Sequence, residues 1–273
     1  MTRRLWLSST AFACFGVYGF PVEAQSRLPI VVHDAPGLQD ALTPANAGRT
    51  VHLERGEYLI TAPLVVPDGA TLEGEGIMLG RGLPDGFAAG SETHILPVTS
   101  FSGDLITLGH GAAIKDIIVE DVFGRTGNDN VIAIHSRTPG DRVSASITRC
   151  EIINPKRPGA GPDGPLGRAL AVLTSNPRLA SAPAPDEDAN VSVVISHSII
   201  RATGGSSAIF AINFASRGEI TIVATSNRIF GSMELTGGVS RPDEVRDARL
   251  TVRSEHNVYA PDVDAPAGTT PVA

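Results

Sequence analysis

Two stretches decide the fold: EITIVATSNRIFGS, residues 219–232, and ARLTVRSEHNVYAP, residues 248–261. Each has alternating apolar residues, then a short polar corner, then one more apolar residue. Alternation at period two is typical of a β-strand with one buried face. A chain that repeats such a pattern at a fixed spacing is a repeat protein, in which each unit buries its apolar face against its neighbours.

The same pattern can be followed through the C-terminal half by its anchor, the apolar residue after each polar corner. The anchors are Val122, Ile152, Ile200, Ile229 and Val258, which are 30, 48, 29 and 29 residues apart. The one long step holds two segments rich in Pro, Gly, Ala and Ser, residues 154–167 and 175–190, with the composition of loops. We expect the five anchors to stack on adjacent rungs with their side chains inside.

One period consists of a strand, a turn, a longer strand, a polar corner, a short strand and a turn, without a convincing amphipathic helix. Parallel stacking of such units predicts an all-β fold: a right-handed, single-stranded parallel β-helix of roughly six coils. A β-sandwich has no reason to repeat at a fixed period. A propeller blade needs four strands and a longer repeat, about 40–50 residues.

The ends of the chain differ from this middle part. Residues 1–24 have the basic start, apolar centre and small-x-small end of a secretory signal. Residues 25–260 form the β-helix domain, and the tail, residues 261–273, has no strand pattern and is expected to be loosely ordered. Without the signal, 20 basic and 28 acidic residues and one cysteine, Cys150, remain.

This composition excludes several classes of protein. The net negative charge argues against a nucleic-acid partner, and no later stretch could span a membrane. A single cysteine excludes an internal disulfide. We therefore expect a secreted or periplasmic protein whose core alone holds the fold. The oligomeric state stays open.

The N-terminal third carries a denser motif. Residues 37–76 contain a short segment with Ala41 and Leu42, then G-x-x-V-x-L-x-x-G-x-Y from Gly48 to Tyr58, then L-x-V-P-x-G-x-T-L-x-G-x-G from Leu64 to Gly76. This region resembles the opening of the pectate-lyase-like right-handed β-helix superfamily. The resemblance implies a short helix around residues 38–42 that caps the first coil. It does not imply a reaction, because that superfamily includes lyases, hydrolases, epimerases, esterases and proteins with no known activity.

The resemblance also implies a ladder of polar residues at one corner of the coil. The residues two before each anchor are Glu120, Cys150, Ser198, Asn227 and His256. Because this column is mixed, only part of an asparagine ladder is expected, and its members are interpreted as structural.

Relatives in the superfamily usually bind glycans along the first strand of each coil. If Ile106, Ile132, Leu170 and Phe210 point inward, then Thr107, Ala133, Ala171 and Ala211 point outward. This face is small and nearly uncharged. A calcium-dependent lyase would need several carboxylates there, so no metal site is expected and no cofactor is assigned.

Charged residues gather at the strand entrances instead. Asp104, Asn130 and Arg168 are at equivalent positions on successive coils, with Asp129 beside Asn130, and His135 is near the exit of its strand. Acid, base and imidazole groups within two rungs could transfer protons, which makes Asp104, Asp129, His135 and Arg168 the catalytic candidates. The alternative is ordinary turn chemistry. The substrate-binding candidates are Lys156, Arg157 and Asn213.

The leading hypothesis is an exported protein that acts on or binds a polysaccharide, with an acidic-glycan lyase as one option. The two long loops would wall a groove with Ala133, Ala171 and Ala211 as its floor. The alternative is a non-catalytic surface or periplasmic scaffold or binding protein.

Overall fold

The computed structural model describes residues 28–76, 92–124, 129–136, 140–155, 167–174, 188–203, 206–213, 217–237 and 247–260. The signal segment, the tail and two substrate-binding candidates, Lys156 and Arg157, lie outside these ranges. No helix of the described part is long and apolar enough to cross a membrane.

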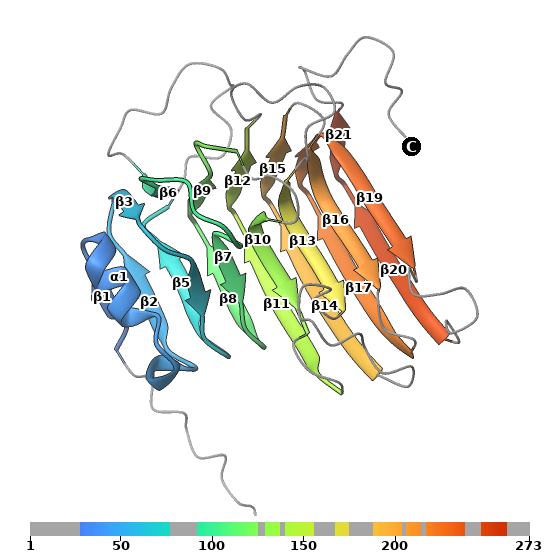
Figure 1. The fold of residues 1–273 in the computed structure, drawn as a ribbon, viewed down its shortest axis with the longest axis horizontal. Coiled ribbons are helices and arrows are strands. Elements are labelled where there is room, and N and C mark those ends of the chain that lie inside the picture. Colours follow the sequence, from blue (N-terminus) through green and yellow to red (C-terminus); the bar gives the residue numbers. More distant parts are fainter. Residues whose placement is uncertain are drawn as a thin grey trace, which may run out of the picture.

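The described strands form three sheets (Figure 1). Sheet A contains β1 (Ile30–Val32), β2 (Thr50–Leu53), β5 (Thr71–Gly74), β8 (Ala112–Lys115), β11 (Arg142–Thr148), β14 (Asp188–Ser196), β17 (Arg217–Thr225) and β20 (Asp247–Glu255). Sheet B contains β3 (Gly56–Ile60), β6 (Thr93–Pro97), β9 (Ile118–Glu120), β12 (Glu151–Asn154), β15 (Ile199–Ala202), β18 (Arg228–Phe230) and β21 (Val258–Ala260). Sheet C contains β4 (Leu64–Val66), β7 (Ile106–Leu108), β10 (Asn130–His135), β13 (Arg168–Thr174), β16 (Ser207–Asn213) and β19 (Ser232–Gly237).

The chain visits sheets A, B and C in turn, and neighbouring strands within each sheet pair in parallel. This order makes six complete coils of three strands, from β2–β3–β4 to β17–β18–β19, and confirms the predicted parallel β-helix. The predicted period is also confirmed, because the longer strand lies in sheet A, the polar corner follows it, and the short strand lies in sheet B.

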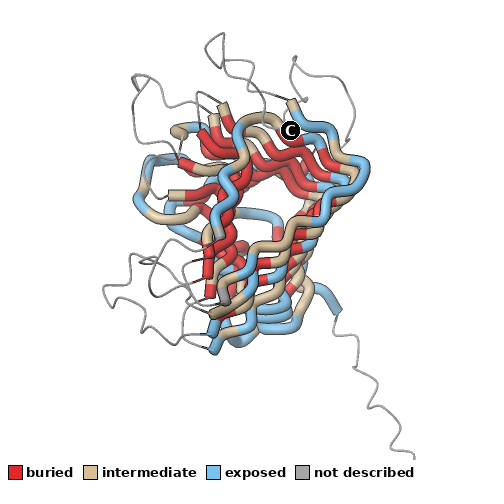
Figure 2. Tube along the Cα trace, turned by 90° about the vertical axis from the view of Figure 1, so that its right-hand side faces the viewer, coloured by how far each residue is buried: buried red, intermediate tan, exposed pale blue. Residues whose placement is uncertain are grey.

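Alternate side chains of each strand fill the inside of the coils. Figure 2 shows the coils stacked one behind the other, with buried residues on their inner side. The column formed by Val119, Ile152, Ile200 and Ile229 runs through sheet B, and each of these side chains is fully or almost fully buried. Three of the predicted anchors therefore stack inside.

The first and last anchors are wrong. Val119, not Val122, pairs with Ile152, and the Val122 side chain is 40% exposed. Tyr259, not Val258, pairs with Ile229, and Val258 is 55% exposed. The left-handed corner residue precedes the stacked side chain by three positions in both coils, Asp116 before Val119 and His256 before Tyr259, so the corners have equal length. Sequence spacing alone does not identify the corner residue and therefore does not set the register.

Each of the last five corners from sheet A to sheet B turns through one non-glycine residue in the left-handed region. The five residues Asp116, Arg149, His197, Ser226 and His256 have φ between 51° and 59°. The next residue carries the ladder: the Ser198 amide donates to Asn227 Oδ1 (2.9 Å), and the Asn227 amide donates to Asn257 Oδ1 (2.8 Å). The ladder is partial, as expected, but Glu120 and His256 do not belong to it. Asn257 does, and Glu120 lies on β9.

The N-terminal end of the coil is covered by α1 (Ala35–Ala41), followed by a single 3-10 turn, Pro44–Asn46. Asp34 caps the helix, since its Oδ1 accepts from the Gly37 amide at 2.8 Å. Leu38 and Ala41 are buried against the first coil. The predicted capping helix is therefore present, and Figure 1 shows it beside β1, β2 and β3.

Candidate functional sites on sheets B and C

The strand entrances of sheet C bring several candidates together. Asn130 and Arg168 pair across β10 and β13, and Asp104 precedes β7 on the adjoining coil. Asp104 Oδ1 accepts from the Asn130 backbone amide (3.2 Å) and from Asn130 Nδ2 (2.6 Å). The Asp129 carbonyl accepts from the Arg168 amide at 3.3 Å. Asp104, Asp129 and Arg168 thus share one rim, which we call the sheet C rim.

The outer face of sheet C beside this rim is covered. Ala133 and Ala171 point outward as predicted, but neither is exposed, and Ala171, Leu173 and Phe210 form a small second apolar cluster. The predicted open floor is therefore wrong, because the face that would hold a sugar ring is already buried.

Two predicted orientations on β16 are also wrong. Ile209, not Phe210, pairs with Leu170, which places Phe210 outside and Ala211 in the core. Every residue from Ala208 to Ile212 is apolar and nearly all are buried, so the alternation along β16 does not show which face meets the core. The outward Phe210 gives the rim a feature that the sequence did not reveal: the Arg168 guanidinium lies 3.5 Å from the centre of its ring.

His135 and Asn213 lie away from the rim. His135 is half-buried at the end of β10 and pairs with Leu173. Asn213 is buried, accepts from Thr174 Oγ1 (2.6 Å), and donates to the carbonyls of Gly218 (2.9 Å) and Arg249 (3.0 Å). These bonds tie the end of sheet C to sheet A, which is a structural role for Asn213.

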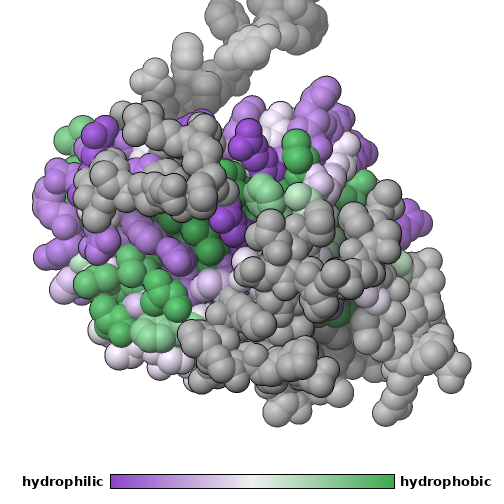
Figure 3. Space-filling view, turned by 90° about the horizontal axis from the view of Figure 1, so that it is seen from above, coloured by the Kyte–Doolittle hydropathy of each residue, from purple (hydrophilic) through white to green (hydrophobic). Residues whose placement is uncertain are grey.

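A second cluster of charges, which the sequence analysis missed, lies on the outer face of sheet B. His94 Nε2 and Glu120 Oε2, on β6 and β9, are 3.2 Å apart, and both side chains are about one-quarter exposed. Glu151 on β12 is 2% exposed, and its Oε1 lies 3.9 Å from the guanidinium of Arg201 on β15. Figure 3 views the molecule from above, and its described part mixes hydrophilic and hydrophobic side chains.

Burial raises the pKa of Glu151. The positive charges of Arg201 and His94 oppose this rise, and the carboxylates of Glu92 and Glu120 add to it. A buried acid beside a cation and an imidazole is an arrangement that active sites use for proton transfer, and that structural ion-pair networks also produce. No sequence motif could have found this cluster, because its members come from four separate coils.

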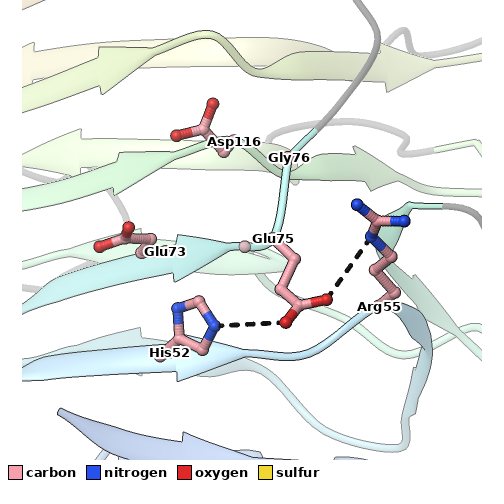
Figure 4. Close-up of a pocket in the computed structure, with 7 residues that line it drawn as sticks. His52, Arg55, Glu73, Glu75, Gly76 and Asp116 are labelled. Carbon is pink, nitrogen blue, oxygen red and sulfur yellow. Dashed lines mark ion pairs between the residues drawn. The ribbon is translucent and has the colours of Figure 1, made fainter.

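An open hollow of about 490 Å³ lies where sheet A turns into sheet B near the N-terminal end (Figure 4). The Glu75 side chain reaches between His52 and Arg55, 3.8 Å from the first and 3.5 Å from the second. Arg149 pairs with Asp116 at the neighbouring corner through two hydrogen bonds. Exposed pairs of this kind contribute little, about 0–1 kcal/mol each. The hollow is therefore lined by paired charges.

The remaining reactive groups do not form a site. Among the described residues, no group of His, Cys, Asp and Glu is arranged to hold a metal ion. Cys150 is fully buried, and this burial raises the pKa of its thiol to about 12. The thiol therefore stays protonated at physiological pH and is a poor nucleophile.

No protein-family model, no curated protein and no solved structure matches the chain.

Proposed function

We propose that the chain is an exported protein of the pectate-lyase-like superfamily that binds an acidic polysaccharide at the sheet C rim. The parallel coils, the capping helix and the partial corner ladder support the superfamily. They support an architecture and not a reaction, because one fold serves many functions. The ligand therefore has to be argued from the rim itself.

One observation carries the proposal: the guanidinium of Arg168 packs against the Phe210 ring. A ring face holds a planar guanidinium in one orientation, and the guanidinium can then offer donors in its own plane. Carboxylates and sulfates, the anionic groups of acidic glycans, are bound well by such a planar donor set. Arg168 is half-buried, so a bound anion would be partly shielded from water.

The half-buried Asp104 carboxylate on a neighbouring rung can accept hydrogen bonds from sugar hydroxyls, whereas the Asn130 side chain is only 3% exposed. Asn130 pairs with Arg168, and Asp104 holds Asn130 in place through two hydrogen bonds. Strands in a sheet are about 4.8 Å apart, so these groups repeat at that spacing along the rim. Because the outer face is buried, the glycan would contact the rim and not lie flat on the sheet.

The test is a binding screen of acidic and neutral glycans by calorimetry, with the protein and its Arg168 variants. We expect acidic glycans to bind, Arg168→Ala to weaken binding about tenfold or more, and Arg168→Lys to restore only part of it, since lysine lacks the planar fork. Arg142→Ala, which removes an exposed cation on β11, is the matched control and should bind as the parent does.

Two results would count against this proposal. If the folded Arg168→Ala variant binds as tightly as the parent, the rim is not the site. If the parent binds none of the glycans, the alternative function, a non-catalytic scaffold, is favoured.

A second candidate function is glycan cleavage, and the Glu151 cluster is the observation that favours it. Glycosidases use two carboxyl groups in different protonation states, and sheet B places the buried Glu151 near the Glu120–His94 pair. Incubation with each bound glycan, followed by analysis of chain ends, tests it. New ends that appear with the parent and not with Glu151→Gln would support catalysis there. Unchanged chains, or equal cleavage by both proteins, would exclude it.

A further inference from the structure

The last described coil of the β-helix consists of β20 and β21. In the described part of the chain, β20 pairs only with β17, and β19 and β21 are likewise the last strands of their sheets (Figure 1). Unpaired backbone groups on a nine-residue strand such as β20 form a template for another strand.

The core is also less covered at this end. Leu250 and Val252 of β20 pair with Ile220 and Ile222 of β17, which are fully buried. Leu250 and Val252 pack on the same core but are only half-buried, and Tyr259 is 46% exposed. At the opposite end, α1 covers the first coil. Repeat proteins usually need a polar cap at both ends, so the exposed last coil calls for a covering partner.

We propose that a second copy of this chain covers the last coil, with β20 of the two copies paired antiparallel around a two-fold axis at Val252. In this register Val252 faces Val252 of the second copy, and Arg249 faces its Glu255. The Arg249–Glu255 pair occurs twice because of the symmetry. Thr251 faces Arg253, so the outer face of the joined sheet carries no like charges opposite each other.

Neighbouring registers are worse. Moving the strands by two residues in one direction sets Arg249 opposite Arg253 of the second copy. Moving them by two residues in the other direction sets Arg253 opposite Arg253 of the second copy. Like charges directly opposite each other are destabilising. Moving them by one residue would turn the apolar row of β20 toward solvent. Charge and burial therefore select the register with Val252 on the axis.

The two ends of the molecule also favour a closed dimer over a chain of copies. A head-to-tail contact would set the last coil against α1, whose apolar residues Leu38 and Ala41 are already buried in their own coil. A tail-to-tail contact joins two open cores and leaves both helices outside, which closes the assembly. This inference does not depend on the proposed glycan.

The first experiment is a charge exchange followed by sedimentation equilibrium. We expect the parent to be a dimer. Arg249→Glu and Glu255→Arg should each weaken the dimer at least tenfold, because each sets like charges opposite twice. An equimolar mixture of the two variants should regain the parent's affinity, since each copy then faces its opposite charge. Arg142→Glu is the matched control, because Arg142 belongs to the same outer row of sheet A as Arg249, three strands from the edge.

The second experiment locates the axis. Residues directly opposite in an antiparallel pair have Cα atoms about 4.5–5.5 Å apart, within the range of a disulfide. In a chain with Cys14→Ser, where buried Cys150 is the one other thiol, Val252→Cys should form a covalent dimer under mild oxidation. Thr251→Cys, one residue off the axis, should form much less.

The proposal is overturned by a parent that stays monomeric at all concentrations measured, or by larger open-ended assemblies. It is also overturned if each charge variant, measured without the other, dimerises as tightly as the parent. The same holds if Thr251→Cys forms as much covalent dimer as Val252→Cys.

Discussion

The Glu151 carboxylate lies 3.9 Å from the Arg201 guanidinium, yet its Oε1 accepts no hydrogen bond from any residue that the structure describes. The pair joins β12 and β15 on the outer face of sheet B. A buried acid that is only partly compensated is costly to ionise, which is the physical reason for its raised pKa.

This raised pKa predicts how stability depends on pH. The folded protein holds the Glu151 proton more tightly than the unfolded chain does. The stabilisation that results is complete at a pH below the pKa of the unfolded chain, about 4.3. It is lost as the pH rises through the pKa of Glu151 in the folded protein. The Glu151→Gln variant has no ionisable group at this position, so it does not lose stability in this way as the pH rises. Its free energy of unfolding relative to the parent should therefore increase as the pH rises above about 4.

Urea unfolding at several pH values measures this difference. Glu57→Gln, which changes an exposed carboxyl group of the same sheet, is the control and should follow the parent. If the free energies of unfolding of Glu151→Gln and the parent differ by the same amount at every pH, the Glu151 carboxyl group does not have a raised pKa.

The core column of sheet B predicts a contrast between two apolar residues. Ile229→Asp should lower the free energy of unfolding by several kcal/mol, because Ile229 is 1% exposed and a carboxylate there has no partner. Val122→Asp should change it by less than about 1 kcal/mol, since Val122 is 40% exposed. Thermal melts of both variants test the corrected register, and equal losses would show that Val122 is in the core.

The corner ladder predicts a graded loss along the coil. Asn227 is buried and donates to the Ile195 carbonyl and to Asn257 Oδ1, both at 2.9 Å. Its replacement by alanine also leaves the Ser198 amide without its acceptor, so a cost of about 2–3 kcal/mol is expected. Asn257→Ala, in the half-exposed last coil, should cost less. The reverse order in denaturant melts would argue against a buried ladder.

Alanine substitution at two glycines with similar φ angles distinguishes backbone strain from a steric clash of the added Cβ. Gly56 and Gly218 have φ of 146° and 152°, so alanine is strained at both, by about 1–3 kcal/mol. A Cβ at Gly56 would meet nothing within 4 Å, whereas one at Gly218 would lie 2.1 Å from the Ala189 carbonyl oxygen. Gly218→Ala should therefore unfold at a clearly lower temperature than Gly56→Ala, and equal melting temperatures would exclude the close contact.

Much of the fold could be predicted from the sequence because its information is local. Alternating apolar residues and a recurring corner are enough to indicate strands, their period and parallel stacking. Ile152, Ile200 and Ile229 stack as predicted for this reason. The capping helix around Leu38 is predicted on other grounds, from the family resemblance of residues 37–76.

The register and the site depend on information that is not local. Phe210 and Ala211 lie on the opposite faces to those predicted, which places Phe210 under Arg168 and Ala211 in the core. Glu120, Glu151 and Arg201 lie on three different coils, and only the pairing of β9, β12 and β15 makes them neighbours. Sequence determined which segments form strands and that these strands stack in parallel. Tertiary structure decided which polar residues meet, because turns of variable length set the distance along the chain between residues that are one rung apart in space.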